Sequence, residues 1–300
     1  MLIDGLSNNA ATGWKPMPRG TPMHIVIFGC GYLGARAARL WQNERQRVTV
    51  VTRSPQRALD LAATGLEPIV ADVSRPETLS KLPACDLLLY SIGYDRTATA
   101  SRQAVTVDGL RAVQSAIADR CGKWIQISST SVYGQTDGGW VDEDSACQPT
   151  EESGQLQLAA EQIVRENSRA LILRLSGIYG PGRLLTRIES LRAQEPLNGD
   201  PEGWLNLIHV DDAARIVCAA AERGSGGKTY LVSDDQPIRR REYYGLLAQR
   251  LELPPPRFGT SRGPRGNSNK RCRNGRLQTE LQVTLQYPTI ATGLPAATKN

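Results

Sequence analysis

The chain of 300 residues has no apolar run of about 18 residues, the length that a helix needs to cross a membrane. We therefore expect no membrane partner. Residues 1–22 lack the continuous apolar core of a secretion signal, and we interpret them as a disordered tail, or as upstream sequence if Met23 is the true start. The six cysteines contain no C-x-x-C pair, so we expect neither a metal site nor a disulfide framework, and a reducing cytoplasm.

Acidic residues are absent between Arg257 and Arg276, although the charged share of the chain is an ordinary 22%. Without this segment the net charge of +6 becomes about −1, so the basicity is local. Phe258 is its single aromatic residue, and no recognition-helix pattern accompanies it, so we expect no nucleic-acid partner. Its basic residues are Arg257, Arg262, Arg265, Lys270, Arg271, Arg273 and Arg276.

Three glycines spaced G-x-G-x-x-G follow the apolar run His24–Phe28 and precede a helical pattern. This order predicts a strand, a tight turn and a helix whose free N–H groups and positive dipole end face a bound diphosphate. An ordinary turn with no ligand is the alternative. The predicted cofactor-binding residues of this turn are Gly29, Cys30, Gly31, Tyr32, Leu33 and Gly34.

The second predicted strand, residues 47–52, has no carboxylate at its end, where an NAD site would carry one to accept from the ribose 2′-OH. Arg53 stands there instead, and an arginine suits the 2′-phosphate of NADP. Arg57 could share this role, and a solvated arginine is the alternative. The sequence thus predicts NADP as cofactor, with NAD as the second choice.

Strands and helices alternate from residue 23 to about residue 180, which predicts an α/β fold with a doubly wound parallel Rossmann sheet. We expect residues 206–233 to complete this domain, and residues 181–205 and 234–300 to form a smaller α/β substrate lobe. Ligands of such sheets bind at the carboxyl ends of the strands. Further cofactor-binding residues are predicted at these ends, namely Asp72, Ser91, Ile92, Gly93 and Ser128.

Five segments together resemble the extended short-chain dehydrogenase/reductase family, which holds nucleotide-sugar epimerases, dehydratases and reductases. They are the glycine turn, Val107-Asp108-Gly109, Ser128-Ser129-Thr130-Ser131-Val132-Tyr133-Gly134, Ile178-Tyr179-Gly180-Pro181-Gly182-Arg183 and His209-Val210-Asp211-Asp212. The stretches Asn206-Leu207-Ile208-His209 and 276–288 further resemble its atypical YeeZ-like branch.

The resemblance implies catalysis by a Tyr-x-x-x-Lys pair and a serine, but Ser153 and Gln157 stand at the tyrosine and lysine positions. Ser129 matches the serine, and Tyr133 or Tyr94 could replace the lost acid, with packing as the alternative role of both tyrosines. Gln157 is expected to hydrogen-bond the nicotinamide ribose, as the lysine would.

Two functions stay open for such a chain. The first is an NADP-dependent oxidoreductase or epimerase-like enzyme for a sugar or hydroxylated metabolite, with Arg183, Arg271 and Arg273 contacting the substrate. The second is a catalytically inactive sensor that only binds NADP. The resemblance also suggests a homodimer through the helices at residues 100–120 and 151–167.

Overall fold

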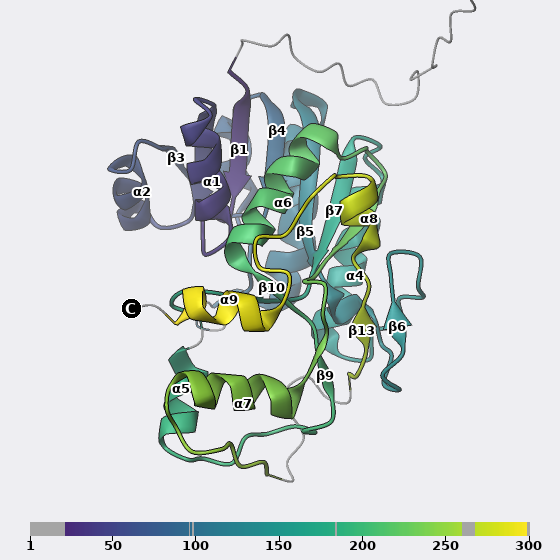
Figure 1. The fold of residues 1–300 in the computed structure, drawn as a ribbon. Helices are drawn as coiled ribbons and strands as arrows, with labels where there is room; N and C mark the ends of the chain where they lie inside the picture. Colours follow the sequence, from purple (N-terminus) through teal and green to yellow (C-terminus); the bar gives the residue numbers. More distant parts are fainter. Residues whose placement is uncertain (1–21, 96, 98, 184, 260–267, 299–300) are drawn as a thin grey trace, which may run out of the picture.

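A central parallel sheet dominates the computed structural model (Figure 1), which describes residues 22–95, 97, 99–183, 185–259 and 268–298. Nearly all of the predicted N-terminal tail lies outside these residues. The strand order is β11-β7-β5-β4-β1-β2-β3, and the prediction of a doubly wound α/β fold is confirmed. The strands are β1 (His24–Phe28), β2 (Arg47–Thr52), β3 (Glu67–Val70), β4 (Cys85–Tyr90), β5 (Cys121–Ser129), β7 (Ala170–Leu175) and β11 (Thr229–Val232).

Helices cover both faces of this sheet, as its apolar strands require, because a parallel sheet exposes hydrophobic side chains on each side. On one face lie α1 and α6, and on the other lie α3 and α4. These helices are α1 (Gly34–Asn43), α6 (Val210–Arg223), α3 (Gly109–Ile117) and α4 (Glu152–Arg165), with α2 (Pro55–Ala62) beside β2 and β3. None of the helices in the described ranges has the length and apolar character to cross a bilayer.

The predicted helix at residues 100–120 is divided into three parts. A π-helical turn (Ala104–Asp108) precedes α3, and a 3₁₀ turn (Ala118–Arg120) follows it. Gly109 stands at the junction, where a Cβ would come within 2.7 Å of the Val73 side chain. The start of α3 is therefore closely packed against the residues that follow β3. Further 3₁₀ turns are η1 (Pro76–Lys81) and η4 (Thr130–Val132).

A second hydrophobic cluster lies beyond the carboxyl ends of the strands and includes Tyr179, Leu197, Tyr243, Leu247 and Ile290. Figure 1 shows its helices α5, α7 and α9 gathered below the sheet. The elements are α5 (Leu185–Arg192), α7 (Arg240–Arg250), α9 (Ile290–Ala297), the pairs β8 (Gly177–Tyr179) with β10 (Leu207–His209) and β9 (Trp204–Leu205) with β12 (Ile238–Arg239), and, at one edge, β6 (Trp140–Val141) with β13 (Arg271–Cys272) and α8 (Gly275–Thr279).

Strand order reverses at β1, which pairs with β2 on one side and with β4 on the other. The chain segments that connect the strands on the two sides of β1 therefore run in opposite directions. A crevice opens between them, beyond the carboxyl end of β1. In open α/β sheets this switch point is where ligands bind. The glycine turn follows β1 directly, so the fold brings it to this crevice.

Candidate functional site

The three glycines of the turn are needed for different structural reasons. Gly29 has a φ of +88°, and a Cβ on it would lie 2.6 Å from the carbonyl oxygen of Ser91. A Cβ on Gly34 would overlap the carbonyl oxygen of Gly29. A Cβ on Gly31, in contrast, would have no atom of the described residues within 4 Å. The protein's own packing requires the first and third glycines, whereas the second faces open space that a diphosphate can enter.

Helix α1 presents an unneutralised positive end to this space. Its N-cap residue, Leu33, provides no side-chain hydrogen bond, and its first turn, described in full, contains no acidic residue. The amides of Ala35 and Arg36 already donate to the carbonyl oxygens of Gly31 and Leu33, at 2.9 and 3.0 Å, so this end of α1 attracts an anion chiefly through the helix dipole. This end of α1 and the open side of Gly31 together fit a dinucleotide diphosphate.

Ser91, at the end of β4, holds the turn in place. Its hydroxyl donates to the carbonyl oxygens of Gly29 and Phe28, at 2.8 and 3.1 Å. Its amide donates to Phe28 as well. We therefore assign the Ser91 side chain to shaping the turn, while Ile92 and Gly93 continue the chain past the crevice.

A cavity of about 410 Å³ lies at the carboxyl ends of β2 and β3. Asp72 is half-buried there, and its Oδ1 accepts from the amide and the hydroxyl of Ser74 at 2.9 and 2.7 Å. Burial raises the pKa of Asp72, but the Ser74 hydrogen bonds and the charges of Arg53 and Arg75 outweigh it and hold this pKa below its ordinary value. The lining residues are Arg53, Ser54, Val70, Ala71, Asp72, Arg75 and Thr78.

The cavity brings Arg53 together with Arg75, a residue that the sequence had not indicated. Arg75 belongs to a turn in which its amide donates to the carbonyl oxygen of Asp72 at 2.9 Å. Arg57 follows Arg53 by four residues, and its positive charge acts on the thiol of Cys30 in the glycine turn, whose pKa burial nevertheless raises. Three arginines thus surround the region between the glycine turn and the cavity.

Ser128, a predicted cofactor contact, already has a hydrogen-bond partner inside the protein. Its hydroxyl is buried and donates to Oε1 of Glu161 at 2.7 Å. Glu161, which is fully buried, also accepts two hydrogen bonds from Arg174, at 2.9 and 2.7 Å. The side chain of Ser128 is therefore part of a buried ion-pair network that joins α4 to β7.

Tyr133 belongs to the same buried network, and its hydroxyl is not exposed as that of a catalytic acid would be. It is 1% exposed, its hydroxyl donates to the carbonyl oxygen of Asp142 at 2.6 Å, and it accepts from Arg174 at 2.9 Å. Burial raises the pKa of Tyr133 and outweighs the charge of Arg174, which lowers it. A hydroxyl with this environment anchors the loop after η4, so packing is the role that the structure gives Tyr133.

Ser129 stands at the end of β5, just before η4. Its Oγ accepts from the amide of Ser131 at 3.1 Å, which orients the hydroxyl and leaves its proton free to be donated elsewhere. Gly154 at the start of α4 packs against this turn, where a Cβ would clash with the carbonyl oxygen of Ser131. One turn further along α4, Oε1 of Gln157 is buried and has no hydrogen-bond partner among the described residues. An unpaired buried acceptor is costly unless a ligand satisfies it.

Tyr32 connects the glycine turn to the loop after β8. Its hydroxyl donates to the carbonyl oxygen of Pro181 at 3.0 Å, and the guanidinium of Arg183 lies 5.3 Å from its ring centre. Arg36 covers the same ring at 4.3 Å and pairs with Asp211 at 3.0 Å. The predicted substrate residue Arg183 is therefore adjacent to the cofactor turn.

Arg271 and Arg273 lie in a different environment. Their guanidinium carbons are 4.8 and 5.5 Å from the ring centre of Trp140, and Arg271 also lies 5.2 Å from that of Trp204. Arg271 further donates from Nε to the carbonyl oxygen of Gly138 at 2.8 Å. Packing against tryptophan thus holds Arg271 in place, while Arg273 stays exposed. Their predicted contact with substrate remains a prediction.

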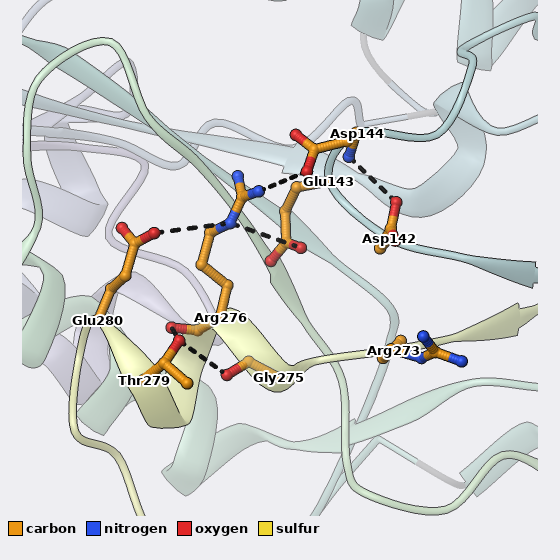
Figure 2. A pocket seen from close by; sticks show the side chains of 8 residues that line it. All are labelled: Asp142, Glu143, Asp144, Arg273, Gly275, Arg276, Thr279 and Glu280. Atoms are coloured by element: carbon orange, nitrogen blue, oxygen red, sulfur yellow. Dashed lines mark hydrogen bonds and ion pairs between the residues drawn. The ribbon is translucent and has the colours of Figure 1, made fainter.

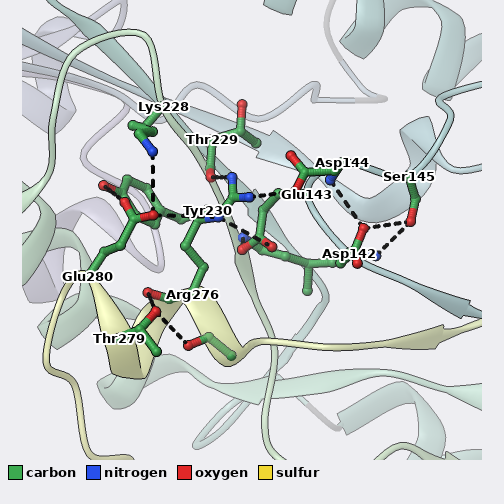
Figure 3. Close-up of polar contacts among 12 residues, drawn as sticks. Asp142, Glu143, Asp144, Ser145, Lys228, Thr229, Tyr230, Arg276, Thr279 and Glu280 are labelled. Atoms are coloured by element: carbon green, nitrogen blue, oxygen red, sulfur yellow. Dashed lines mark hydrogen bonds and ion pairs between the residues drawn. The ribbon is translucent and has the colours of Figure 1, made fainter.

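Arg276, from the same basic segment, occupies an acidic hollow of about 230 Å³ (Figure 2). Its guanidinium pairs with Asp144 at 2.7 Å and approaches Glu143 and Glu280 at 3.9 and 3.8 Å. Glu143 is almost fully buried and accepts from the amide of Leu231 at 2.8 Å. These contacts (Figure 3) connect α8 to the edge strand β11, and they give Arg276, one of the seven basic residues of the segment, internal ion pairs.

The side chain of His209 caps the N-terminus of α6. Nδ1 of His209 accepts from the amide of Asp211 at 3.3 Å. Asp212 instead accepts from the amides of Gln286 and Tyr287, both at 2.8 Å, and so holds the C-terminal segment.

Among the described residues no group of three or more His, Cys, Asp or Glu could hold a metal ion.

His209 is expected to make the stability of the protein sensitive to acid. Burial lowers its pKa below the ordinary 6.5, although the charges of Asp211 and Asp212 oppose this. The folded state therefore binds its proton less readily than the unfolded state, so its contribution to stability is complete above pH 6.5 and is lost as the pH falls. Urea unfolding should show a smaller free energy of unfolding at pH 5 than at pH 7.

The matched variant for this expectation is His209→Asn, because asparagine also caps helices and does not titrate. We expect the loss of stability between pH 7 and pH 5 to be smaller in this variant. Equal losses in the two proteins would assign the acid sensitivity to other groups.

Comparison with known proteins agrees with this geometry. Residues 25–233 match the model of the NAD dependent epimerase/dehydratase family. The chain is 28% identical over 277 residues to protein YeeZ of Escherichia coli (strain K12), which covers 88% of this chain and 96% of that protein. This likeness confirms the resemblance on which the sequence interpretation relied.

Two solved structures have a similar fold. A functionally unknown conserved protein from Silicibacter pomeroyi is 28% identical with a TM-score of 0.76, covering 92% of this chain and 98% of that one. The dTDP-glucose 4,6-dehydratase DesIV from Streptomyces venezuelae, solved with NAD and TYD bound, is 20% identical with a TM-score of 0.80, covering 92% and 95%. The region that the family model matches, residues 25–233, contains the glycine turn, the switch point and the strands of the parallel sheet. The chain therefore belongs to the NAD dependent epimerase/dehydratase family.

Proposed function

We propose that this protein is an NADP(H)-dependent oxidoreductase or epimerase-like enzyme that acts on a sugar or another hydroxylated metabolite. The observation that carries the proposal is the open side of Gly31 at the unneutralised end of α1, at the switch point of the sheet. The bound cofactor would supply hydride exchange with a substrate carbon. The side chains around it bind, orient and shield the reacting groups.

The preference for NADP over NAD is supported by the arginines around the adenosine end of the crevice. Arg53 and Arg75 line the cavity at β2 and β3, and β2 itself ends without a carboxylate. Guanidinium groups bind phosphate oxygens through paired, charge-assisted hydrogen bonds. We propose that Arg53, with Arg75 and Arg57 nearby, binds the 2′-phosphate, and that Asp72 accepts from the adenine amino group.

Ser129 is the residue that we propose to hold a substrate oxygen. Its hydroxyl is oriented by the amide of Ser131 and retains a proton to donate. Gln157 supplies an unpaired acceptor suited to the nicotinamide ribose. Of the two tyrosines considered as acids, Tyr94 fits better than the buried Tyr133, because the guanidinium carbon of Arg102 lies 4.6 Å from its ring centre and Tyr94 is only partly buried.

The proposal predicts that Ser129→Ala abolishes turnover and leaves NADPH affinity within severalfold. The hydroxyl would contact substrate and not the diphosphate, so its loss acts on the chemical step. NADPH oxidation should be followed with sugar nucleotides, aldehydes and ketones, and NADPH affinity by calorimetry.

Ser131→Ala is the matched control, since it removes a neighbouring hydroxyl while the Ser131 amide still orients Ser129. We expect it to keep most of the activity. Unchanged turnover in Ser129→Ala would rule out the role assigned to this serine.

A second candidate function is an NADP-binding sensor without chemistry. It is favoured by the replacement of the tyrosine and lysine by Ser153 and Gln157, and by the locked hydroxyl of Tyr133. Micromolar NADPH binding with no cofactor oxidation across the substrate panel would support the sensor over the enzyme.

The proposal also includes a cytoplasmic location and a homodimer through α3 and α4. Both follow from the sequence, the first from the absence of C-x-x-C pairs and the second from the family resemblance. Light scattering of the purified protein would test the dimer.

A further inference from the structure

The arginine proposed to bind the 2′-phosphate already has an anionic partner. Nη2 of Arg53 lies 2.5 Å from Oδ2 of Asp95. Arg53 follows β2, whereas Asp95 follows β4, and β1 lies between these strands in the sheet. The ion pair therefore reaches across the carboxyl end of β1, beside the glycine turn.

The carboxylate of Asp95 is held in this position from its other side. Its Oδ1 accepts from the amide and from the hydroxyl of Thr97, at 2.9 and 2.7 Å. These two hydrogen bonds hold the pKa of Asp95 below its ordinary value, and the charge of Arg53 adds to the effect. Asp95 is therefore a charged group near neutral pH.

The pair is exposed enough for a ligand to compete with it. The side chains of Arg53 and Asp95 are 48% and 43% exposed. Solvent screens such a pair, so it is weak, and a phosphate dianion is a stronger partner for a guanidinium than a single carboxylate. A bound 2′-phosphate would nevertheless lie close to the carboxylate and be repelled by it.

We propose that Asp95 is a specificity-determining residue, whose carboxylate competes for Arg53 and so limits the preference for NADPH over NADH. This inference rests on the proposed function, because it concerns the same dinucleotide site. The end of β2 has no carboxylate of its own, and the loop after β4 places the carboxylate of Asp95 beside it instead. A cofactor with a 2′-hydroxyl carries no charge there, so its affinity depends little on Asp95.

The test is calorimetric titration of the full chain with NADPH and NADH, using the variant Asp95→Asn. The amide keeps an oxygen for the Thr97 donors but removes the negative charge. We expect NADPH affinity to rise about five- to tenfold, since an exposed ion pair and one like-charge repulsion are removed. NADH affinity should stay within twofold.

Two further variants make the result specific. Glu67→Gln removes the same charge from the exposed pair with Arg47, at the opposite end of β2 and β3, and should change neither affinity. In an Arg53→Met background, Asp95→Asn should tighten NADPH binding by no more than about twofold, because the guanidinium for which it competes is gone and only the screened repulsion of the 2′-phosphate is relieved.

Three outcomes would overturn the inference while leaving the proposed function intact. They are unchanged NADPH affinity in Asp95→Asn, an equal gain for both coenzymes, and a gain that is as large without Arg53 as with it. If neither coenzyme bound to any of the proteins, including the unaltered chain, the proposed function itself would fail and the inference with it.

Discussion

Gly31→Ala is expected to weaken NADPH binding by more than about tenfold without lowering the free energy of unfolding. A Cβ at this position meets no described atom of the protein, so the folded chain accepts the methyl group. The same methyl group would occupy the space into which a diphosphate must move to reach the positive end of α1. Calorimetric titration with NADPH and thermal unfolding of the unliganded protein would measure the two effects separately.

The neighbouring glycines provide the control for this prediction. Gly29→Ala must strain a backbone at φ +88° and press against the carbonyl of Ser91, and Gly34→Ala must press against the carbonyl of Gly29. Both should lower the melting temperature, because they disturb the turn itself. NADPH affinity unchanged in Gly31→Ala would mean that no diphosphate approaches this turn.

Arg174→Met is expected to lower the free energy of unfolding by about 3–5 kcal/mol, a large part of the stability of an ordinary domain. Arg174 and Glu161 are 3% and 0% exposed, and two hydrogen bonds join them. Removing the arginine leaves a buried carboxylate with Ser128 and the half-exposed Arg165 as its remaining partners. Urea unfolding monitored by circular dichroism would measure the loss.

The double variant Glu161→Leu with Arg174→Met distinguishes a buried charge from a lost volume. Without the uncompensated carboxylate, at least half of the stability should return, because an apolar pair needs no hydrogen bonds. A double variant as unstable as Arg174→Met alone would show that packing, and not the charge of Glu161, causes the loss.

The elements nearest to the cofactor site could be predicted because their signals are local. The strand predicted at residues 47–52 is formed by these same residues, as β2. Three glycines in a short window indicate a turn through backbone freedom alone. The strands β6, β8, β9, β12 and β13 were not predicted, since two or three residues are too few to show an alternation.

The contacts of individual polar side chains could not be predicted in the same way. Ser128 and Ser129 are adjacent in a strand, so their side chains point to opposite faces, and only the packing of α4 decides which one is buried with Glu161. Tyr133 is equally consistent with an acid or an anchor until the position of Arg174 is known. Asp95 is separated from Arg53 by 42 residues, and no spacing rule connects them.

The sequence by itself determined the parallel α/β fold, the family, and the glycine turn after the first strand, because each of these depends on motifs whose residues lie close together in the chain. Only the tertiary structure decided which polar groups remain available at that turn. It placed Ser128 and Tyr133 in a buried ion-pair network, added Arg75 to the cavity at the carboxyl ends of β2 and β3, and brought Asp95 to Arg53. The physical reason is that hydrogen bonds and ion pairs form between groups close in space, and the order of strands in the sheet sets which groups those are.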